Sequence, residues 1–253
     1  MPENLPALVP GTLYLVATPI GNLEDITLRA LRVLKECDLV AAEDTRHTGQ
    51  LLKHFGISKP LLSYFQFNEA RRSEAILERL ARGDKIALVT DAGSPGISDP
   101  GERVVKAAIA AGFRVEPVPG PSALVAALTA SGLATDEFVF VGFLPHKSGQ
   151  RRKKLRSLCD FAGTLVLYES PYRVERLLGE LHEIFPARRV VLARELTKRY
   201  EEFLRGLPAE LAAVLRERTV KGEFVVIVEG APGDRERTER PASDKSPDPC
   251  PQS

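Results

Sequence analysis

Short apolar runs alternate with amphipathic segments along most of the chain. In the first half, the runs cover residues 13–17, 39–42, 86–89 and 113–118. Nearly every position in them is apolar, which is typical of parallel strands covered on both faces. Helical spacing follows, as at Ile26, Ala30 and Val33, where Asp25 is a suitable N-cap, and at residues 68–81 and 102–110. This alternation predicts an α/β fold.

The second half repeats the pattern with apolar runs at residues 138–141, 164–168, 189–193 and 224–228. We therefore expect a leader at residues 1–10, an N-terminal α/β domain at 11–119 and a C-terminal α/β domain at 120–230. Residues 231–253 are rich in proline and almost devoid of large apolar side chains, which predicts a disordered tail. Two halves of similar size suggest a ligand cleft between them.

Loops marked by glycine or proline follow the strands at residues 18–22, 91–101, 119–123 and 169–173. The central loop, residues 91–101, holds three glycines and two prolines, with hydrogen-bonding groups such as Asp91, Ser94 and Ser98. Open α/β sheets bind ligands at this edge. Spacing alone leaves two interpretations, a ligand cradle and a well-capped turn.

Glu43, Asp44, Arg46 and His47 crowd together directly after a buried strand. One interpretation is structural: Asp44 caps the next helix while Arg46 pairs with a neighbouring acid. The other is contact with a substrate, since unpaired charges are costly beside a core.

Composition narrows the classes of function. The net charge of +1 gives no global attraction to nucleic acid, so a polyanion would need a local patch. The three cysteines lack metal-ligand spacing, and we expect no metal site. Neither a signal peptide nor a membrane span is apparent, which predicts a soluble, cytoplasmic protein. The G-x-G-x-x-G and G-x-x-x-x-G-K-[ST] phosphate motifs are also absent.

A local basic patch does exist. Residues 147–156 contain six lysines or arginines and no acid. The run is either a solvated helix face or a surface that contacts phosphates.

The chain resembles the ribosomal RNA small-subunit methyltransferase I family, a branch of the tetrapyrrole methylase superfamily. The resemblance is carried by ATPIGNLEDI at residues 17–26, AEDTRHT at 42–48 and DAGSPGISDPG at 91–101. Shorter matches are GFLP at 142–145, ESPYR at 169–173, RELTK at 194–198 and KGE at 221–223.

This resemblance implies a two-domain fold with a mostly parallel N-terminal sheet, a mixed C-terminal sheet and S-adenosylmethionine in a cleft between the domains. It also implies a homodimer that methylates the ribose 2′-hydroxyl of a decoding-centre cytidine in 16S rRNA. By position, the cofactor contacts would be Ile20, Asp91, Gly93, Ser94, Ile97, Ser122, Ala123 and Tyr168. Thr18 and Pro19 depart from the superfamily's usual glycine-rich first loop.

A ribose hydroxyl needs a base to accept its proton. The polar candidates are Glu169, Glu195, Lys198, Asp44 and His47, of which we select Lys198 and Glu169 as catalytic. Arg46, Arg151, Arg152 and Arg173 are the expected RNA contacts. A structural ion pair between Glu169 and Arg173 is the alternative.

Two rival functions stay open. One is a tetrapyrrole methyltransferase of the precorrin type, which the basic run disfavours. The other is an RNA-binding or ribosome-assembly factor that keeps the fold without catalysis.

Overall fold

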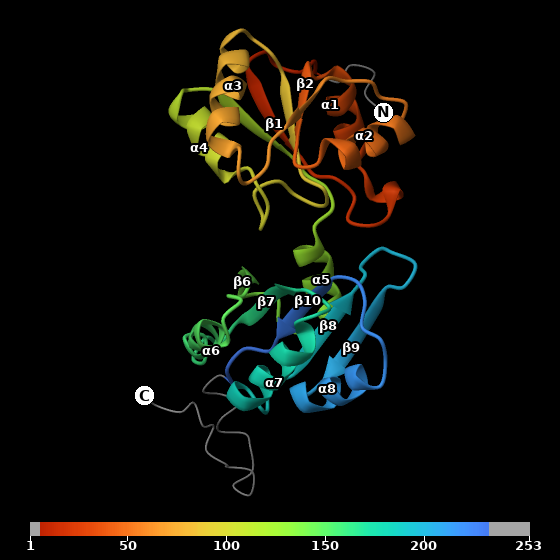
Figure 1. Ribbon diagram of the computed structural model, residues 1–253, viewed down its shortest axis with the longest axis vertical. Coiled ribbons are helices and arrows are strands. Elements are labelled where there is room, and N and C mark those ends of the chain that lie inside the picture. The colour runs from red at the N-terminus through yellow and green to blue at the C-terminus, as the bar shows by residue number, and fades with distance from the viewer. Residues whose placement is uncertain (1–5, 233–253) are drawn as a thin grey trace, which may run out of the picture. The chain divides into compact units, whose positions relative to one another are not determined.

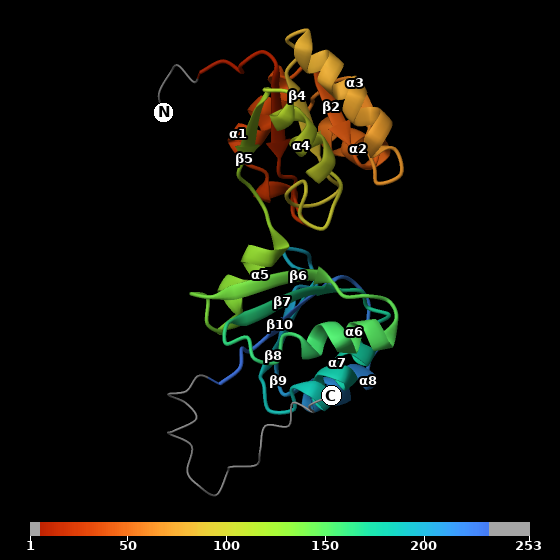
Figure 2. The same cartoon turned by 90° about the vertical axis from the view of Figure 1, so that its left-hand side faces the viewer.

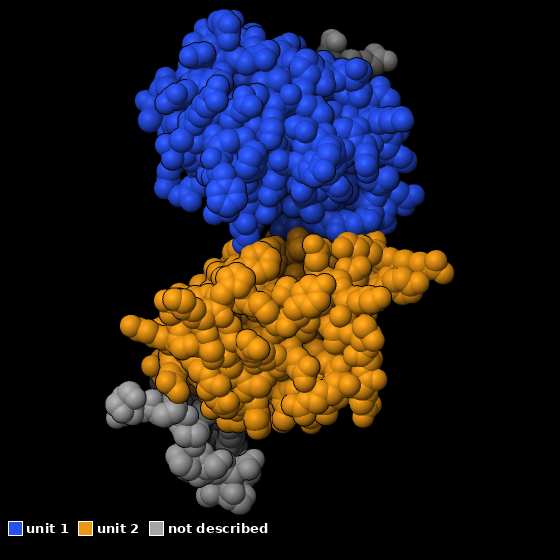
Figure 3. Space-filling model, viewed as in Figure 1, with its two compact units in different colours: residues 1–122 blue, residues 123–253 orange. Residues whose placement is uncertain are grey.

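The computed structural model describes residues 6–232 and divides after Ser122 into a first unit, residues 1–122, and a second unit, residues 123–253 (Figure 3). The apolar runs place the domain boundary at residue 119, close to this division. The first residues of the predicted leader and nearly all of the predicted tail lie outside the described residues.

A parallel five-stranded sheet forms the centre of the first unit (Figure 1). Its strand order is β3-β2-β4-β1-β5. Its strands are β1 (Thr12–Val16), β2 (Leu39–Ala42), β3 (Leu61–Ser63), β4 (Ile86–Val89) and β5 (Arg114–Val118). Strands β2 and β4 are buried at every position, as their unbroken apolar sequences predict.

Four helices cover this sheet, two on each face (Figure 1). Helices α1 (Leu28–Glu36) and α2 (Thr45–His54) pack on one face through Val33, Leu34 and Leu52. Helices α3 (Glu69–Ala81) and α4 (Glu102–Ala110) pack on the other through Ile76, Leu80 and Val104. All the strands are parallel, so every loop that follows a strand emerges at the same edge.

The predicted helix cap at Asp25 is wrong. Residues Leu23–Asp25 form a short 3-10 helix, and Ile26 then returns to extended backbone. Thr27 caps α1 instead, since its hydroxyl accepts a hydrogen bond from Ala30 N at 3.1 Å. Asp44 does cap α2, as one interpretation of the acidic cluster expected.

The second unit contains a mixed five-stranded sheet in the order β6-β7-β10-β8-β9 (Figure 2). Its strands are β6 (Phe138–Phe143), β7 (Thr164–Glu169), β8 (Val190–Arg194), β9 (Glu202–Gly206) and β10 (Phe224–Val228). Only β6 and β7 pair in parallel, and the other neighbours are antiparallel. The expected fold class, with a parallel first sheet and a mixed second one, is confirmed.

Three helices cover one face of the second sheet: α6 (Ser148–Arg156), α7 (Val174–Ile184) and α8 (Pro208–Arg216). Leu155, Leu177 and Leu211 bring them into one buried cluster with the strands. Helix α5 (Ala123–Ser131), which opens the unit, packs against β8 and β10.

Candidate functional site

Loops from four strands meet at the carboxyl edge of the first sheet. Thr18, after β1, and Gly93, after β4, form an isolated antiparallel bridge. The buried Thr18 hydroxyl also donates to Thr90 O at 3.0 Å. The first and central loops are therefore fastened together by both backbone and side chain.

Gly93 lies at this junction of the two loops. Its φ of +82° lies in the left-handed region that favours glycine. A Cβ at this position would lie 3.5 Å from Ile20 Cγ2 and 3.8 Å from Pro121 O. Three of the loops that the sequence predicts to bind a cofactor thus converge on one glycine.

The other predicted cofactor residues of the central loop lie on its outer part. Ser94 is half-buried, and its backbone carbonyl accepts a hydrogen bond from Ile97 N at 3.3 Å. Ile97 is 42% exposed, a large fraction for an isoleucine beside a core. The loop therefore combines a tightly packed inner end at Gly93 with an exposed apolar side chain that a ligand could cover.

Asp91 connects the central loop to the loop after β2. Its Oδ1 accepts a hydrogen bond from Asp44 N at 3.1 Å, and its own N–H donates to Glu43 Oε2 at 3.4 Å. Burial raises the pKa of Glu43, and the negative charges of Asp91 and Asp44 add to the effect. Hydrogen bonds from Arg46 hold the pKa of Asp44 well below its usual range. Arg46 itself is exposed and pairs with Asp44, as the structural interpretation expected.

In the second unit, Tyr168 lies beside the start of α5. Its hydroxyl accepts a hydrogen bond from Leu124 N at 3.2 Å. The rings of Phe140 and Phe143 contact it edge to face, with centroids 4.9 and 5.7 Å away. Ala123 precedes Leu124 and is half-buried, as is Ser122 at the end of the first unit.

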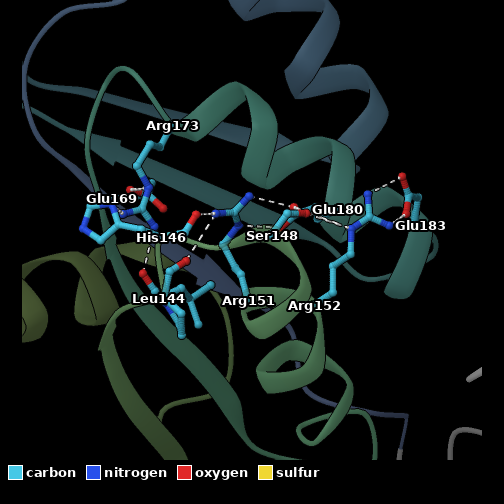
Figure 4. Close-up of polar contacts among 10 residues, drawn as sticks. Leu144, His146, Ser148, Arg151, Arg152, Glu169, Arg173, Glu180 and Glu183 are labelled. Atoms are coloured by element: carbon cyan, nitrogen blue, oxygen red, sulfur yellow. Dashed lines mark hydrogen bonds and ion pairs between the residues drawn. The ribbon is translucent and has the colours of Figure 1, made fainter.

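Glu169, predicted to be catalytic, is buried at the end of β7 (Figure 4). Its Oε1 accepts a hydrogen bond from Ser170 N at 2.9 Å and lies 3.1 Å from Arg173 Nε. Its Oε2 has no hydrogen-bond partner among residues 6–232. A buried carboxylate oxygen without a partner is costly, and such groups are common at functional sites.

The other two guanidinium nitrogens of Arg173 also have partners. Nη2 donates to Leu144 O at 2.8 Å, and Nη1 lies 3.1 Å from His146 Nδ1 (Figure 4). The ion pair between Glu169 and Arg173, which the sequence left as an alternative, is therefore present and also holds the segment that leads into α6.

The basic run separates into buried and exposed members. Arg151 is only 2% exposed, and its Nε and Nη2 donate to Glu180 at 2.6 and 2.7 Å (Figure 4). Its Nη1 donates to the carbonyl oxygens of Pro145 and His146 at 3.2 and 3.0 Å. The burial of Arg151 does not support the contact with RNA that the sequence predicts, and that contact stays a prediction.

Arg152 pairs with Glu183, with Nη2 3.0 Å from Oε1. Lys153, Lys154 and Arg156 are exposed.

The sequence did not single out Glu180, the partner of Arg151. Its only signal was an acid on the otherwise apolar face of α7, where Leu177 and Leu181 flank it.

Lys198 lies between two carboxylates. Its Nζ donates to Glu195 Oε1 and to Glu223 Oε2, both at 3.0 Å. Burial by itself lowers the pKa of Lys198, but the hydrogen bonds to these carboxylates outweigh it, and the pKa is raised. In this arrangement the lysine is a cation at neutral pH.

Two features are absent from the described part of the chain. No cluster of His, Cys, Asp and Glu side chains within residues 6–232 could hold a metal ion. Over the same range, no helix is long and apolar enough to cross a membrane.

The sequence matches a family model described as Tetrapyrrole (Corrin/Porphyrin) Methylases over residues 12–212. A relative from Halalkalibacterium halodurans, named Ribosomal RNA small subunit methyltransferase I, is 53% identical over 220 residues, which are 87% of this chain and 76% of the relative. A relative of the same name from Synechocystis is 51% identical over 227 residues, 89% of this chain and 81% of the relative.

Solved structures share the fold at lower identity. Uroporphyrin-III C-methyl transferase from Thermus thermophilus, complexed with S-adenyl homocysteine, matches with a TM-score of 0.61 and 23% identity over 86% of this chain and 97% of that one. Cobalt precorrin-4 methyltransferase matches with a TM-score of 0.64 and 18% identity over 87% and 95% of the two chains. With the family match and the close relatives, these findings show that the chain belongs to the ribosomal RNA small subunit methyltransferase I family of the tetrapyrrole methylases.

Proposed function

We propose that this protein is an S-adenosylmethionine-dependent methyltransferase that modifies the ribose 2′-hydroxyl of a decoding-centre cytidine in 16S rRNA. The observation that carries the proposal is the identity of 53% and 51% to relatives named as small-subunit rRNA methyltransferases. The cytidine and the 2′-hydroxyl come from the family resemblance of the sequence motifs.

We assign the cofactor to the loops that converge on Gly93. The chain's residues fit such a ligand in two respects: the glycine permits close backbone approach beside Ile20, and Ile97 offers an exposed apolar surface. When bound, S-adenosylmethionine supplies an electrophilic methyl group and leaves as a neutral thioether. Asp91 would orient polar groups of the ligand. Contacts from Ser122, Ala123 and Tyr168 stay predictions of the family resemblance.

Glu169 is the stronger candidate for the proton acceptor. Its Oε2 is a carboxylate oxygen that accepts no hydrogen bond from any described residue. Lys198 would need to lose its proton first, and Glu195 and Glu223 oppose that loss. We therefore give Lys198 an electrostatic role, as a cation that attracts the substrate.

The exposed cations of α6, Lys153, Lys154 and Arg156, are the groups of the basic run that we propose to meet RNA phosphates. Arg46 is exposed as well, although it shares its charge with Asp44. Arg151, Arg152 and Arg173 hold α6 and the segment before it in place through ion pairs and carbonyl contacts.

The test uses small ribosomal subunits from cells that lack the modification, purified protein and S-adenosylmethionine labelled in its methyl group. The proposal expects label in the 16S rRNA, recovered after nuclease digestion as 2′-O-methylcytidine. Label in a base, or no label at all, would overturn it. Methylation of a uroporphyrin-type tetrapyrrole in a parallel reaction would support the first rival function. Calorimetry without any heat of S-adenosylmethionine binding would support the non-catalytic one.

The homodimer that the family resemblance implies and the cytoplasmic location that the sequence predicts both stay predictions. Sedimentation analysis of the purified protein would decide the first.

A further inference from the structure

Residues 64–68, which we call the aromatic turn, connect β3 to α3 and hold two phenylalanines at the surface. Phe65 is 38% exposed and Phe67 is 90% exposed. Their rings meet edge to face, with centroids 6.4 Å apart and planes at 70°. Single exposed apolar residues are ordinary, but two aromatic rings in contact form a small surface that suits a planar ligand.

The aromatic turn has a defined internal structure. The Asn68 side chain accepts a hydrogen bond from Phe65 N at 2.9 Å and donates to Ser63 O at 3.2 Å. Tyr64 is buried beneath it and donates to Glu69 Oε1 at 3.1 Å. Because these bonds fix the backbone that carries the two rings, a ligand would have little conformational entropy to remove from the backbone.

Glu69 also connects the aromatic turn to the central loop. Its Oε1 accepts a hydrogen bond from Gly101 N, the last residue of that loop, at 3.2 Å. Strand β3 pairs in parallel with β2, so the aromatic turn emerges at the same edge of the sheet as the proposed cofactor loops. A group bound on the rings would therefore lie on the edge where the methyl donor is assigned.

The arginines that follow the aromatic turn in the sequence favour a phosphate-bearing ligand. Arg71 and Arg72 stand at the third and fourth positions of α3, the former exposed and the latter half-buried. Cations near a helix N-terminus oppose the helix dipole, so they do not serve the stability of the helix. Exposed aromatic rings next to arginines are the combination that binds unpaired nucleotides, whose bases stack while their phosphates meet the cations.

We propose that the aromatic turn stacks an unpaired base of the RNA substrate, with Arg71 and Arg72 against the neighbouring phosphates. This inference rests on the proposed function, because it assumes an RNA substrate. It adds a substrate-binding surface to the first unit, whereas the basic run belongs to the second.

The chain contains no tryptophan, so Phe67→Trp introduces a single fluorescent reporter at the exposed ring. Titration with a single-stranded RNA oligonucleotide taken from the decoding region should quench its emission, because stacking brings a base onto the indole. No quenching at saturating RNA would overturn the proposal. A spectral change that depends on protein concentration without RNA would overturn it in favour of contact with a second copy.

Kinetics on small subunits gives the second readout. Phe67→Leu keeps an apolar side chain but removes the ring, and we expect it to raise the KM for the subunit about tenfold. Phe67→Trp should keep a KM near that of the wild type, and the KM for S-adenosylmethionine should not change in either variant. Ile109→Ala, at a 61% exposed apolar position of α4, is the matched control and should behave as wild type.

A Phe67→Leu enzyme with an unchanged KM for the subunit would overturn the stacking proposal. If the wild-type protein methylates no rRNA, the proposed function fails instead, and the fluorescence titration, which needs no turnover, still decides whether the aromatic turn stacks a base.

Discussion

Thr18 and Gly93 exchange two backbone hydrogen bonds, with Thr18 N 2.9 Å from Gly93 O and Gly93 N 3.0 Å from Thr18 O. The pair joins the loop after β1 to the loop after β4, although 75 positions separate the two residues in the sequence. Gly93 also has a φ of +82°, which makes the residue a sensitive point of the proposed cofactor site.

Gly93→Ala should lower both stability and cofactor affinity. A left-handed backbone costs an alanine about 1–2 kcal/mol, and the added Cβ would occupy space beside Ile20 and Pro121. Gly112→Ala is the control, since Gly112 has a φ of +78° but nothing within 4 Å of its Cβ position. We expect similar losses of stability in thermal unfolding, whereas only Gly93→Ala weakens S-adenosylmethionine binding in calorimetry. Equal affinities for the two variants would contradict the assignment.

Glu169→Gln should reduce kcat about a hundredfold, because it removes the proposed proton acceptor while keeping the shape of the side chain. The KM for S-adenosylmethionine should stay close to the wild-type value. Glu183→Gln, which removes only an exposed partner of Arg152, serves as the control with wild-type kcat. An unchanged kcat in Glu169→Gln would exclude this carboxylate as the base.

Lys198→Arg distinguishes a charge from a base. Arginine keeps the positive charge between Glu195 and Glu223 but cannot be deprotonated in a protein. If Lys198 acts as a cation that attracts the substrate, the variant should retain most of the wild-type kcat/KM, whereas Lys198→Met should lose it. If a folded Lys198→Arg protein were inactive, Lys198 would be the catalytic base after all.

Breaking the buried ion pair between Arg151 and Glu180 should destabilise the packing of α6 against α7. Glu180→Gln leaves the buried guanidinium without its counter-charge, and we expect a loss of about 3–5 kcal/mol in the free energy of unfolding, measured with urea. The double variant Arg151→Met/Glu180→Leu should recover much of that loss, since apolar residues of similar volume often replace a buried pair without cost. A double variant as unstable as the single one would show that the pair itself contributes the stability.

The same pair predicts a pH dependence. Burial opposes the charge on Glu180, but hydrogen bonds from Arg151 and Ser148 outweigh it, and the pKa of Glu180 is lowered from the ordinary value of about 4.5. A depressed pKa contributes stability above the unfolded-state pKa, and that contribution disappears as the pH falls through the folded-state pKa. The difference in unfolding free energy between wild type and Glu180→Gln should therefore be full at pH 7 and narrow below about pH 4.5. A difference that is constant from pH 7 to pH 3 would contradict this linkage.

The exposed cations of α6 should set part of the salt dependence of RNA binding. Changing Lys153, Lys154 and Arg156 to glutamine should reduce the slope of log Kd against log salt by about 0.7–0.9 for each phosphate that the variant no longer neutralises. Lys35→Gln, on the exposed face of α1, should leave the slope unchanged. A triple variant with the wild-type slope would place the RNA-binding surface elsewhere.

Much of the fold follows from local patterns. The run of residues 86–89 is wholly apolar and is bounded by polar and glycine-rich segments, so strand β4 and the loop after it could be predicted from sequence alone. Asp25 shows the limit of this reasoning: it has the chemistry of a helix cap, but the 3-10 turn at Leu23–Asp25 moved the cap to Thr27. Such a choice depends on backbone geometry two residues away, which residue preference does not encode.

The sequence by itself determined the alternation of strands and helices, the positions of the loops and the family, because periodicity and motif are properties of neighbouring residues. Tertiary structure alone decided what each charged residue does. Arg151 and Lys153 look alike in a basic run, yet the first is buried against Glu180 on α7 and the second is exposed. Likewise, only the structure identifies the aromatic turn as a candidate surface, because folding places Phe67 at the surface and connects Glu69 to Gly101. Burial and pairing are relations between distant segments, and only the folded chain brings those segments together.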